Sequence, residues 1–381
     1  REMELVGSLV MEEARRAAVP AGDALAVDRE LFSRAVTGRI EADPAIELVR
    51  EEATAFPEPG EGFVVVATGP LTSAPLAESL LARLGGDRLY FYDAVAPIVE
   101  GSSLDLSVLY AASRWGKGSG ADYLNVPLTR EEYERFVADL LAGEKLPYHD
   151  FEKAVHFEGC LPIEEMAVRG PETLRHGPMK PFGLRDPRTG REPYAAVQLR
   201  QDDLAKSHWN LVGFQTKLRV GEQRRVFRTL PGFANAEFVR YGMLHRNTFL
   251  NGPAHLDRLF RFKEDPRVLF AGQVTGVEGY LESAATGLMV GATLAQLLEG
   301  REPLPLPFST ALGALSRHVS ESDPEHYGPM NVTFGLIDDS ALPPIRDRSK
   351  RREEIVRRAL AEVAAWRDAA LGPASEAPGK P

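Results

Sequence analysis

Two short stretches of the chain, residues 63–67 and 268–271, are continuously apolar, and each is followed by a glycine-containing turn. Unbroken apolar runs of this length are typical of strands that are buried on both faces of a parallel sheet. A helical pattern over residues 73–84, begun by a serine cap, follows the first run, and residues 88–92 form the next expected strand. This order of strand, turn, helix and strand predicts a doubly wound α/β sheet.

The second apolar run opens into a glycine-rich turn and a helix that we expect to end near Leu298. Along this helix Gly279, Ser283, Gly287 and Gly291 recur every four residues, so one face carries almost no side chain. Glycine costs about 1 kcal/mol relative to alanine inside a helix, so the face needs a reason. That reason is close approach either of another backbone or of a flat ligand. The helix N-terminus would also suit an anion such as a pyrophosphate.

The two ends of the chain carry further helical patterns. Residues 1–18 have a helical pattern, Asp28 precedes a second helix with apolar residues on one face, and residues 45–49 can form a strand. A charged helix is expected at residues 350–371. Because the chain begins at Arg1 rather than at a methionine, we interpret its start as trimmed.

The middle of the chain has a different pattern. A capping box at residues 129–132 begins a helix, and residues 222–230 indicate a short basic helix. Residues 195–200 and 209–215 alternate apolar and polar positions, and they can pair across a polar loop.

These patterns predict a discontinuous domain organisation. Residues 1–100 and 264–345 are expected to form one Rossmann-like α/β domain, built from both ends of the chain. Residues 101–263 are expected to form an α+β insertion domain, and residues 346–381 a C-terminal helix and tail.

Composition limits the class of protein. The 381 residues are enough for two domains, and 44% hydrophobic and 26% charged residues are ordinary for a soluble globular protein. No run approaches the roughly 20 apolar residues that span a bilayer, and no secretory signal is visible. The single cysteine excludes an internal disulfide framework. We therefore expect a cytoplasmic protein without a membrane partner.

The charge is unevenly distributed along the chain. The overall net charge is −10, which argues against general nucleic-acid binding, and DNA is not an expected partner. Residues 169–263, however, contain 18 Lys and Arg but 8 Asp and Glu, a net charge of +10, whereas the remainder carries −20. Such charges can simply lie on solvated faces, but a basic block of this length favours a phosphate-rich partner.

Three positions carry residue types that are capable of chemistry. Cys160 is either a small buried apolar residue or a nucleophile in an electropositive site. Lys180 lies in a stiff loop of prolines and glycines at residues 177–183, and it is either solvated or presented to a carboxylate or phosphate. His245, beside Arg246, can bond to or stack on a ring, or it can be structural. The sequence shows no metal-ligand cluster, Walker loop or nucleophile elbow.

Several short motifs occur in a specific order and spacing. They include Ala67-Thr-Gly-Pro-Leu-Thr72, Asp122-Tyr-Leu-Asn125, Phe157-Glu-Gly-Cys160, Gly177-Pro-Met-Lys-Pro181, Val212-Gly-Phe-Gln-Thr216, His245-Arg-Asn-Thr248 and Gly276-Val-Glu-Gly-Tyr-Leu-Glu-Ser-Ala284. With these motifs the chain resembles the bacterial folate- and FAD-dependent tRNA (uracil-5-)-methyltransferases, the TrmFO family, from Arg1 to about Asp339.

The resemblance implies a mechanism. Methylenetetrahydrofolate would donate a one-carbon unit, which passes through a flavin nitrogen to a uridine in the T-loop of tRNA. Reduced FAD, recharged by NADPH or NADH, would supply the electrons that convert methylene into methyl. The cysteine matching Cys160 would add to the uracil ring, because a uracil carbon is a poor nucleophile until a thiolate adds to its neighbour. The uridine must leave its stack to reach the flavin, and the basic block would hold tRNA phosphates.

The resemblance also assigns residues. Cys160 is the expected catalytic residue, Lys180 is expected to bind RNA or folate anions, and His245 and Arg246 are expected near the substrate, with His245 stacking by the pterin. No metal is expected. The residues expected to contact FAD are Thr68, Gly69, Gly272, Gly276, Gly279, Tyr280, Glu282, Ser283 and Ala284.

One departure from the family pattern stands out. In the family, a first strand with a Gly-x-Gly-x-x-Gly turn for the FAD pyrophosphate, and a segment with a second functional cysteine, lie upstream of the position of Arg1. We expect the gene to begin earlier, and we expect weak FAD retention if the present chain is the whole polypeptide. Two alternatives stay open: a related, longer flavoprotein that modifies the tRNA wobble uridine, and a non-catalytic tRNA-binding remnant without flavin.

Overall fold

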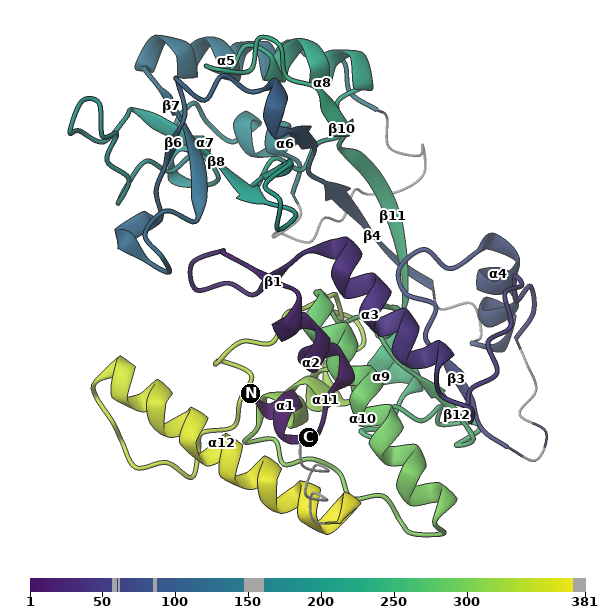
Figure 1. Cartoon of the computed structure of the whole chain (residues 1–381). Coiled ribbons are helices and arrows are strands. Elements are labelled where there is room, and N and C mark those ends of the chain that lie inside the picture. The colour runs from purple at the N-terminus through teal and green to yellow at the C-terminus, as the bar shows by residue number, and fades with distance from the viewer. Residues whose placement is uncertain (57–59, 61, 85–87, 147–160, 373–381) are drawn as a thin grey trace. The chain divides into compact units, whose positions relative to one another are not determined.

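The chain folds into two compact units, each built from separate stretches of sequence (Figure 1). The computed structural model describes residues 1–56, 60, 62–84, 88–146 and 161–372. The first unit comprises Arg1–Glu12, Val49–Tyr90 and Asn247–Pro381, and the second comprises Glu13–Leu48 and Phe91–Arg246. The chain passes from one unit to the other four times: within α2 (Leu9–Arg16), in the loop at residues 48–49, within β4 (Arg88–Val95) and within β11 (Met243–Leu250).

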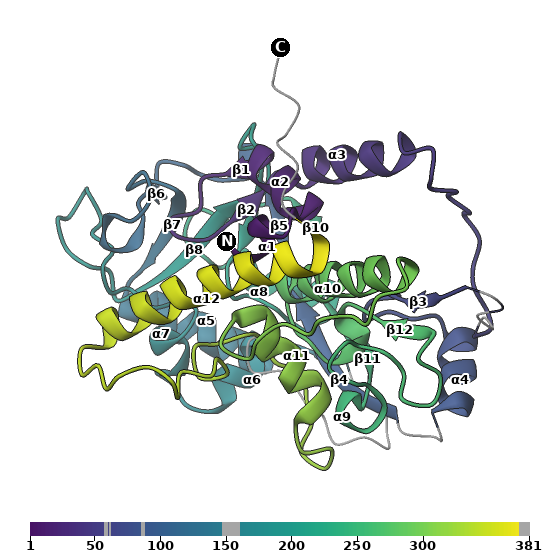
Figure 2. The same cartoon turned by 90° about the horizontal axis from the view of Figure 1, so that it is seen from below.

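The first unit is mostly helical around one parallel strand pair. Its elements are α1 (Glu2–Leu5), β3 (Val64–Val66), α4 (Ala74–Arg83), α9 (Gly252–His255), β12 (Val268–Phe270), η4 (Gln273–Thr275), α10 (Tyr280–Leu298), α11 (Ala311–Glu321) and α12 (Arg348–Leu371). Helices α11 and α12 both pack against α10, and α1 packs against α12 (Figure 2). The start of the chain is tied to this cluster, because both carboxylate oxygens of Glu2 accept backbone N–H groups of α11, from Ala311 and Leu312, at 2.9 Å.

The two predicted apolar strands pair as expected, but only one of them is buried on both faces. Strands β3 and β12 are parallel, with Val66 opposite Phe270. All three residues of β12 are buried, whereas Val65 of β3 is 41% exposed. In the described residues β3 has β12 as its sheet partner, so its other side carries no strand. The strand expected at residues 88–92 forms β4, but it pairs with β11 in a separate two-stranded sheet.

The second unit is built around a six-stranded antiparallel sheet of order β10-β5-β9-β8-β7-β6. Its strands are β5 (Ile98–Glu100), β6 (Tyr110–Ala111), β7 (Tyr123–Leu128), β8 (Ala195–Gln201), β9 (His208–Leu211) and β10 (Phe238–Arg240), with β1 (Ala18–Val19) and β2 (Ala26–Val27) forming a separate pair. Its helices are α3 (Arg29–Glu41), η1 (Gly101–Ser103), η2 (Arg114–Gly116), α5 (Arg130–Ala142), α6 (Ile163–Val168), α7 (Thr173–His176) and α8 (Val220–Phe227).

The core of the second unit holds the sheet and its helices together. Phe136 of α5 and Phe227 of α8 are fully buried with Phe214, and ring centroids of Phe136 and Phe214 lie 6.0 Å apart. The predicted capping box of α5 is confirmed: Thr129 Oγ1 accepts the Glu132 N–H at 3.2 Å, and Glu132 Oε2 accepts the Thr129 N–H at 2.8 Å. The predicted pairing of β8 with β9 is also confirmed.

Local predictions for the N-terminal segment were less accurate. The helix expected over residues 1–18 is broken into α1 and α2 at Gly7, whose φ is +83°. Asp28 caps α3 as predicted, since its Oδ1 accepts the Leu31 N–H at 3.0 Å. The predicted apolar face of α3 is not buried among the described residues. Residues 45–49 form no strand and are exposed, because no neighbouring strand takes up their hydrogen bonds.

The observed units differ from the expected domain boundaries. Residues 13–48 cluster with the middle of the chain rather than with its ends, and the boundaries fall at residues 90 and 246 rather than 100 and 263. Helix α12 is part of the first unit rather than a separate tail, because it buries Ile355 and Val363 and the Trp366 indole donates to the Leu304 carbonyl at 2.8 Å. We therefore keep the proposal of a discontinuous domain organisation, and we replace the expected boundaries by those of the two compact units.

Among the described residues, α10 is long and apolar enough by composition to cross a membrane, which the count of consecutive apolar residues had not indicated. A buried helix in a protein core passes the same test. Ala285, Met289 and Val290 of α10 are buried in the first unit, so this single helix is weak evidence for a membrane span.

Candidate functional site

The candidate cofactor site lies at the carboxyl edge of the parallel pair in the first unit. The Ala271 N–H donates to the Val66 carbonyl at 3.0 Å, which continues the ladder to the ends of both strands. Thr68 and Gly69 therefore follow β3 at the same edge where Gly272 follows β12. In open α/β sheets this edge is where nucleotide ligands bind. The structure thus brings together two predicted segments about 200 residues apart in sequence.

Two glycines at this edge offer open backbone. Gly69 and Gly272 have φ of +68° and +79°, a region that residues with side chains rarely adopt. No described atom lies within 4 Å of where a Cβ on either glycine would be. The Gly272 N–H donates to Thr286 Oγ1 at 2.7 Å, which fixes the turn against α10. These two positions fit a ligand that approaches the backbone closely.

The next two glycines are explained by the chain itself. A Cβ on Gly276 would lie 2.4 Å from the hydroxyl of Tyr327, which donates to the Thr275 carbonyl at 2.6 Å. A Cβ on Gly279 would lie 2.5 Å from Glu282 Oε2 and 2.8 Å from Asn331 Nδ2. Packing against Tyr327 therefore explains Gly276, and the φ of +106° explains Gly279, whether or not a ligand is bound.

The first turn of α10 supplies the remaining predicted contacts. Tyr280 is 97% exposed, and Ser283 and Ala284 are half-buried. Glu282 is engaged internally, since its Oε1 accepts the Val332 N–H at 3.0 Å. The first backbone N–H groups of any helix lack intrahelical acceptors, and the helix dipole makes this end electropositive. An anionic or electron-rich group fits beside Ser283 better than beside Glu282.

The glycine face of α10 is bare. Gly287 and Gly291 are exposed, and no described atom lies within 4 Å of where their Cβ atoms would be. The glycine face was expected to allow close approach either of another backbone or of a flat ligand. Within the described residues, no other backbone approaches Gly287 or Gly291. The opposite face carries the buried residues Ala285 and Met289.

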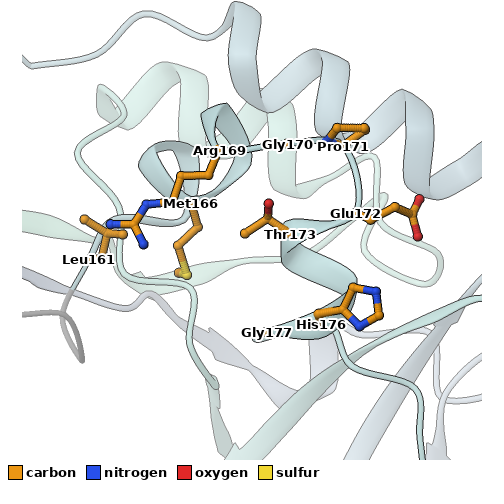
Figure 3. Close-up of a pocket in the computed structure, with 9 residues that line it drawn as sticks. All are labelled: Leu161, Met166, Arg169, Gly170, Pro171, Glu172, Thr173, His176 and Gly177. Atoms are coloured by element: carbon orange, nitrogen blue, oxygen red, sulfur yellow. The ribbon is translucent and has the colours of Figure 1, made fainter.

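The second unit contains a cavity lined by residues that follow the predicted nucleophile in sequence. Cys160 itself lies outside the described residues. The chain resumes at Leu161, which lines an open cavity of about 830 Å³ together with residues of α6, α7 and their connection (Figure 3). Among the residues that line the cavity, Arg169 lies near Leu161 in this view, whereas Glu172 and His176 lie on the opposite side of the picture (Figure 3).

A buried carboxylate anchors the segment that leaves Cys160. The Ile163 N–H donates to the Gln215 carbonyl at 2.7 Å. One residue later, Glu164 is fully buried and accepts the Lys217 N–H at 2.6 Å and the Thr216 hydroxyl at 3.0 Å. Burial raises the pKa of the Glu164 carboxyl above its ordinary value, and these hydrogen bonds only partly oppose that shift.

The predicted substrate residues lie in the second unit. Lys180 is exposed, and its Nζ lies 5.7 Å from the centroid of the Phe182 ring. The Lys180 carbonyl accepts from Arg114 Nη2 at 2.5 Å, which fixes the loop. His245 and Arg246 lie on β11, and their side chains are outside the described part of the structure. The predicted cofactor residues thus gather in one unit and the predicted substrate residues in the other.

Sequence reasoning missed Trp115. This residue is 70% exposed, and its backbone has φ +59°, which is unusual for a residue with a bulky side chain. A signal was present in Ser113-Arg-Trp-Gly-Lys-Gly-Ser-Gly120, where an aromatic residue stands between basic and glycine residues. Within the described ranges, no group of three or more His, Cys, Asp or Glu side chains could hold a metal ion.

Comparison with known proteins assigns the chain to a family. A family model described as glucose inhibited division protein A matches residues 1–302. Proteins named methylenetetrahydrofolate--tRNA-(uracil-5-)-methyltransferase TrmFO, from Geobacter sulfurreducens and Pelobacter propionicus, are 57% and 54% identical over 96% and 98% of this chain, and the matches cover 83% and 82% of those proteins. The chain belongs to the TrmFO family.

Solved structures agree with the fold of this TrmFO family member. Two crystal forms of Aquifex aeolicus GidA match with a TM-score of 0.64 each, at 14% and 16% identity over 96% and 84% of this chain. This chain spans 64% and 61% of their length. At this identity the likeness shows the fold, an α/β architecture with a Rossmann-like domain.

The glycines near α10 predict opposite responses to alanine. Gly276→Ala should lower the free energy of unfolding by about 2 kcal/mol or more, because the new Cβ meets Tyr327 in a left-handed backbone conformation. Gly287→Ala should raise it by about 0.5–1 kcal/mol, because the site is helical and open. Urea unfolding followed by circular dichroism measures both, and equal stability of the two variants would contradict this packing.

The anchor at Glu164 predicts a pH dependence. A carboxyl whose folded pKa is raised contributes stability that is present below its unfolded pKa and lost as pH rises through the folded pKa. Glu164→Gln removes this titration but keeps a hydrogen-bonding side chain. The variant should therefore gain stability relative to wild type as the pH rises from about 4 to about 8, because the wild-type carboxylate must ionise in a buried position. Urea unfolding across this pH range measures the difference in free energy of unfolding between the two proteins. That difference would not change with pH if Glu164 were not buried.

Proposed function

We propose that this chain is a flavin-dependent methyltransferase that carries the one-carbon unit of methylenetetrahydrofolate to a T-loop uridine of tRNA and yields 5-methyluridine. The observation that carries the proposal is the 57% identity over 96% of the chain to a curated relative whose name states this donor, this RNA and this uracil carbon. The other relatives at 52–54% identity bear the same name, and this supports the same reaction.

FAD fits the edge formed by β3, β12 and the start of α10. Gly69 and Gly272 offer backbone with open space beside it, which suits close approach of a dinucleotide. The N-terminus of α10 suits the diphosphate or the electron-rich edge of the flavin. We propose that Thr68, Gly69, Gly272 and Ser283 contact FAD directly. Gly276 and Gly279 would shape the turn, since packing and backbone conformation already explain them.

FAD in its reduced form would supply the two electrons that turn a methylene group into methyl, and NADPH or NADH would restore them. The protein's own part is to hold and activate the uridine. We propose that the Cys160 thiolate forms a bond to the ring carbon beside the methylated one, which moves electron density onto the methylated carbon. The thiolate leaves again when the methylated carbon loses its proton, which restores the double bond of the ring.

The basic block of the second unit supports an RNA substrate. Residues 169–263 carry a net charge of +10 in a chain of net −10, and most of them belong to the second unit. Positive charge of this kind binds phosphates with little regard to sequence, which suits a structured tRNA. We propose Lys180, His245 and Arg246 as substrate contacts on this unit. A cytoplasmic location, where tRNA is modified, is part of the proposal.

A second candidate function has its own observation. The matching family model and the solved neighbours carry the GidA name rather than the TrmFO name. The alternative raised by the sequence resemblance, modification of the wobble uridine of the anticodon instead of the T-loop, is this second candidate. The two reactions differ in the RNA segment that is modified, so one set of transcripts distinguishes them.

Removing the nucleophile tests the main proposal. With FAD, methylenetetrahydrofolate and NADPH supplied, wild type should methylate a tRNA transcript at the T-loop uridine. Cys160→Ser should reduce the rate to below about 1% of wild type while tRNA binding is retained. Mass spectrometry of nuclease fragments locates the methyl group. Modification confined to the anticodon loop would favour the second candidate, and binding without turnover in wild type would favour a non-catalytic remnant.

A charge placed at the start of α10 tests the flavin site. Ser283→Asp puts a carboxylate in the first helical turn, where it favours the helix dipole but repels an anionic ligand. The dissociation constant for FAD should rise about tenfold or more, with no loss of thermal stability. Ser283→Asn, of similar shape and without charge, should bind FAD nearly as wild type does. Flavin fluorescence titration measures both, and unchanged affinity of the aspartate variant would place the FAD elsewhere.

A further inference from the structure

We propose that Trp115 is a stacking platform for an unpaired base of the RNA substrate, and that Lys180 neutralises a phosphate of the same RNA. This inference rests on the proposed function, and it names where on the second unit the RNA is held. Two loops build the platform: residues 113–120, between β6 and β7, and residues 177–183, before β8.

The indole of Trp115 is exposed yet held in place. Its side chain is 70% exposed, while its backbone sits at φ +59° and ψ +22°. A bulky residue keeps such a conformation only where the surroundings fix it, and strained positions of this kind gather at functional sites. The backbone N–H of Trp115 donates to the Gly183 carbonyl at 3.1 Å. The backbone N–H of Ser113 donates to the Gly120 carbonyl at 2.8 Å, which closes the loop.

One face of the indole is covered and the other is presented. A Cβ on Gly183 would lie 2.7 Å from both Cδ2 and Cε2 of Trp115. These two atoms share the bond between the fused rings, so the backbone of Gly183 lies over the ring face. Gly183 also has φ +78°, which makes glycine the residue that allows this approach. Because the side chain is still 70% exposed, the opposite ring face is open to a partner.

The same two loops present positive charge. Arg114 joins them, since its Nη2 donates to the Lys180 carbonyl at 2.5 Å and its Nη1 to Gln198. Lys180 is exposed and, among the described residues, forms no ion pair with a carboxylate; its Nζ lies 5.7 Å from the Phe182 ring centroid. Arg185, two residues beyond Gly183, is likewise exposed without an acidic partner in the described ranges. Lys117, in contrast, is paired with Asp23.

A fixed aromatic face beside unpaired cations fits single-stranded RNA. Unstacked bases bind to aromatic side chains through their π-face, and the adjoining phosphates need cations. An apolar protein partner would need a wider apolar surface than one indole whose neighbouring loop carries the exposed Lys180. The basic excess of residues 169–263 makes the charge complementarity specific to a polyanion. A T-loop supplies both unpaired bases and closely spaced phosphates.

Binding of the 381-residue chain, loaded with FAD, to a fluorescently labelled T-arm stem-loop tests this inference. Trp115→Ala should raise the dissociation constant about 5- to 150-fold, the range that loss of one base–aromatic stack gives. Trp115→Phe and Trp115→Tyr, which keep a flat ring, should recover most of the affinity. Lys180→Ala should weaken binding and reduce the slope of log K against log salt by about 1. Leu106→Ala, another exposed apolar residue of this unit, is the matched control and should bind as wild type does.

Indole fluorescence gives an independent readout. The chain has 3 tryptophans, and of these Trp209 and Trp366 are buried. Quenching on addition of the stem-loop should therefore be present in wild type and lost in Trp115→Phe. Unchanged affinity of Trp115→Ala, or equal affinities of the alanine, phenylalanine and tyrosine variants, would overturn the platform. If either of these results is found while wild type still methylates the stem-loop, the proposed function stands and only the stacking platform is refuted. If the stem-loop binds through Trp115 but wild type does not methylate it, the platform stands and the proposed function is refuted.

Discussion

The parallel pairing of β3 with β12 is the constraint on which the candidate cofactor site depends. Three residues of each strand lie in register, from Val64 opposite Val268 to Val66 opposite Phe270. Parallel strands cannot be joined by a tight turn, so the pairing must bring together segments that are far apart in the chain. Once it forms, the turns after both strands meet at one edge. The turn after β12 leads directly into α10, which adds an electropositive helix end at the same edge.

The glycines at this edge fall into two physical classes. Gly276 and Gly279 leave space that Tyr327, Glu282 and Asn331 fill from the chain's own later segments. Gly69 and Gly272 leave space that the described residues do not fill. A sequence motif lists all four alike, and only the neighbouring atoms separate glycines that serve folding from those that can admit a ligand. The same reasoning keeps the carboxylate of Glu282 with the fold, since it caps the Val332 N–H.

The second unit positions its chemistry in a different way. Its antiparallel sheet packs on a buried aromatic core, and the proposed RNA contacts Trp115 and Lys180 stand on loops between strands, whereas His245 and Arg246 lie on β11. The segment after Cys160 is fixed by the buried Glu164, and the loops of Trp115 and Lys180 are fixed to each other through Arg114 and Gly183. Hydrogen bonds to groups on other segments of the chain thus hold these residues in place. A methyltransferase that must accept a large folded RNA benefits from exposed residues whose orientation does not vary.

The sequence by itself determined the elements whose signals are local: the capping box at Thr129, the cap at Asp28, the pairing of β8 with β9, and the glycine helix α10. Its ordered motifs also identified the family. Tertiary structure alone decided that Val65 is exposed and that β4 pairs with β11, because burial and strand partners depend on residues distant in sequence. It alone revealed Trp115 as a fixed and open ring, since that property arises from Gly183, 68 positions further along the chain, and no local pattern encodes such a contact.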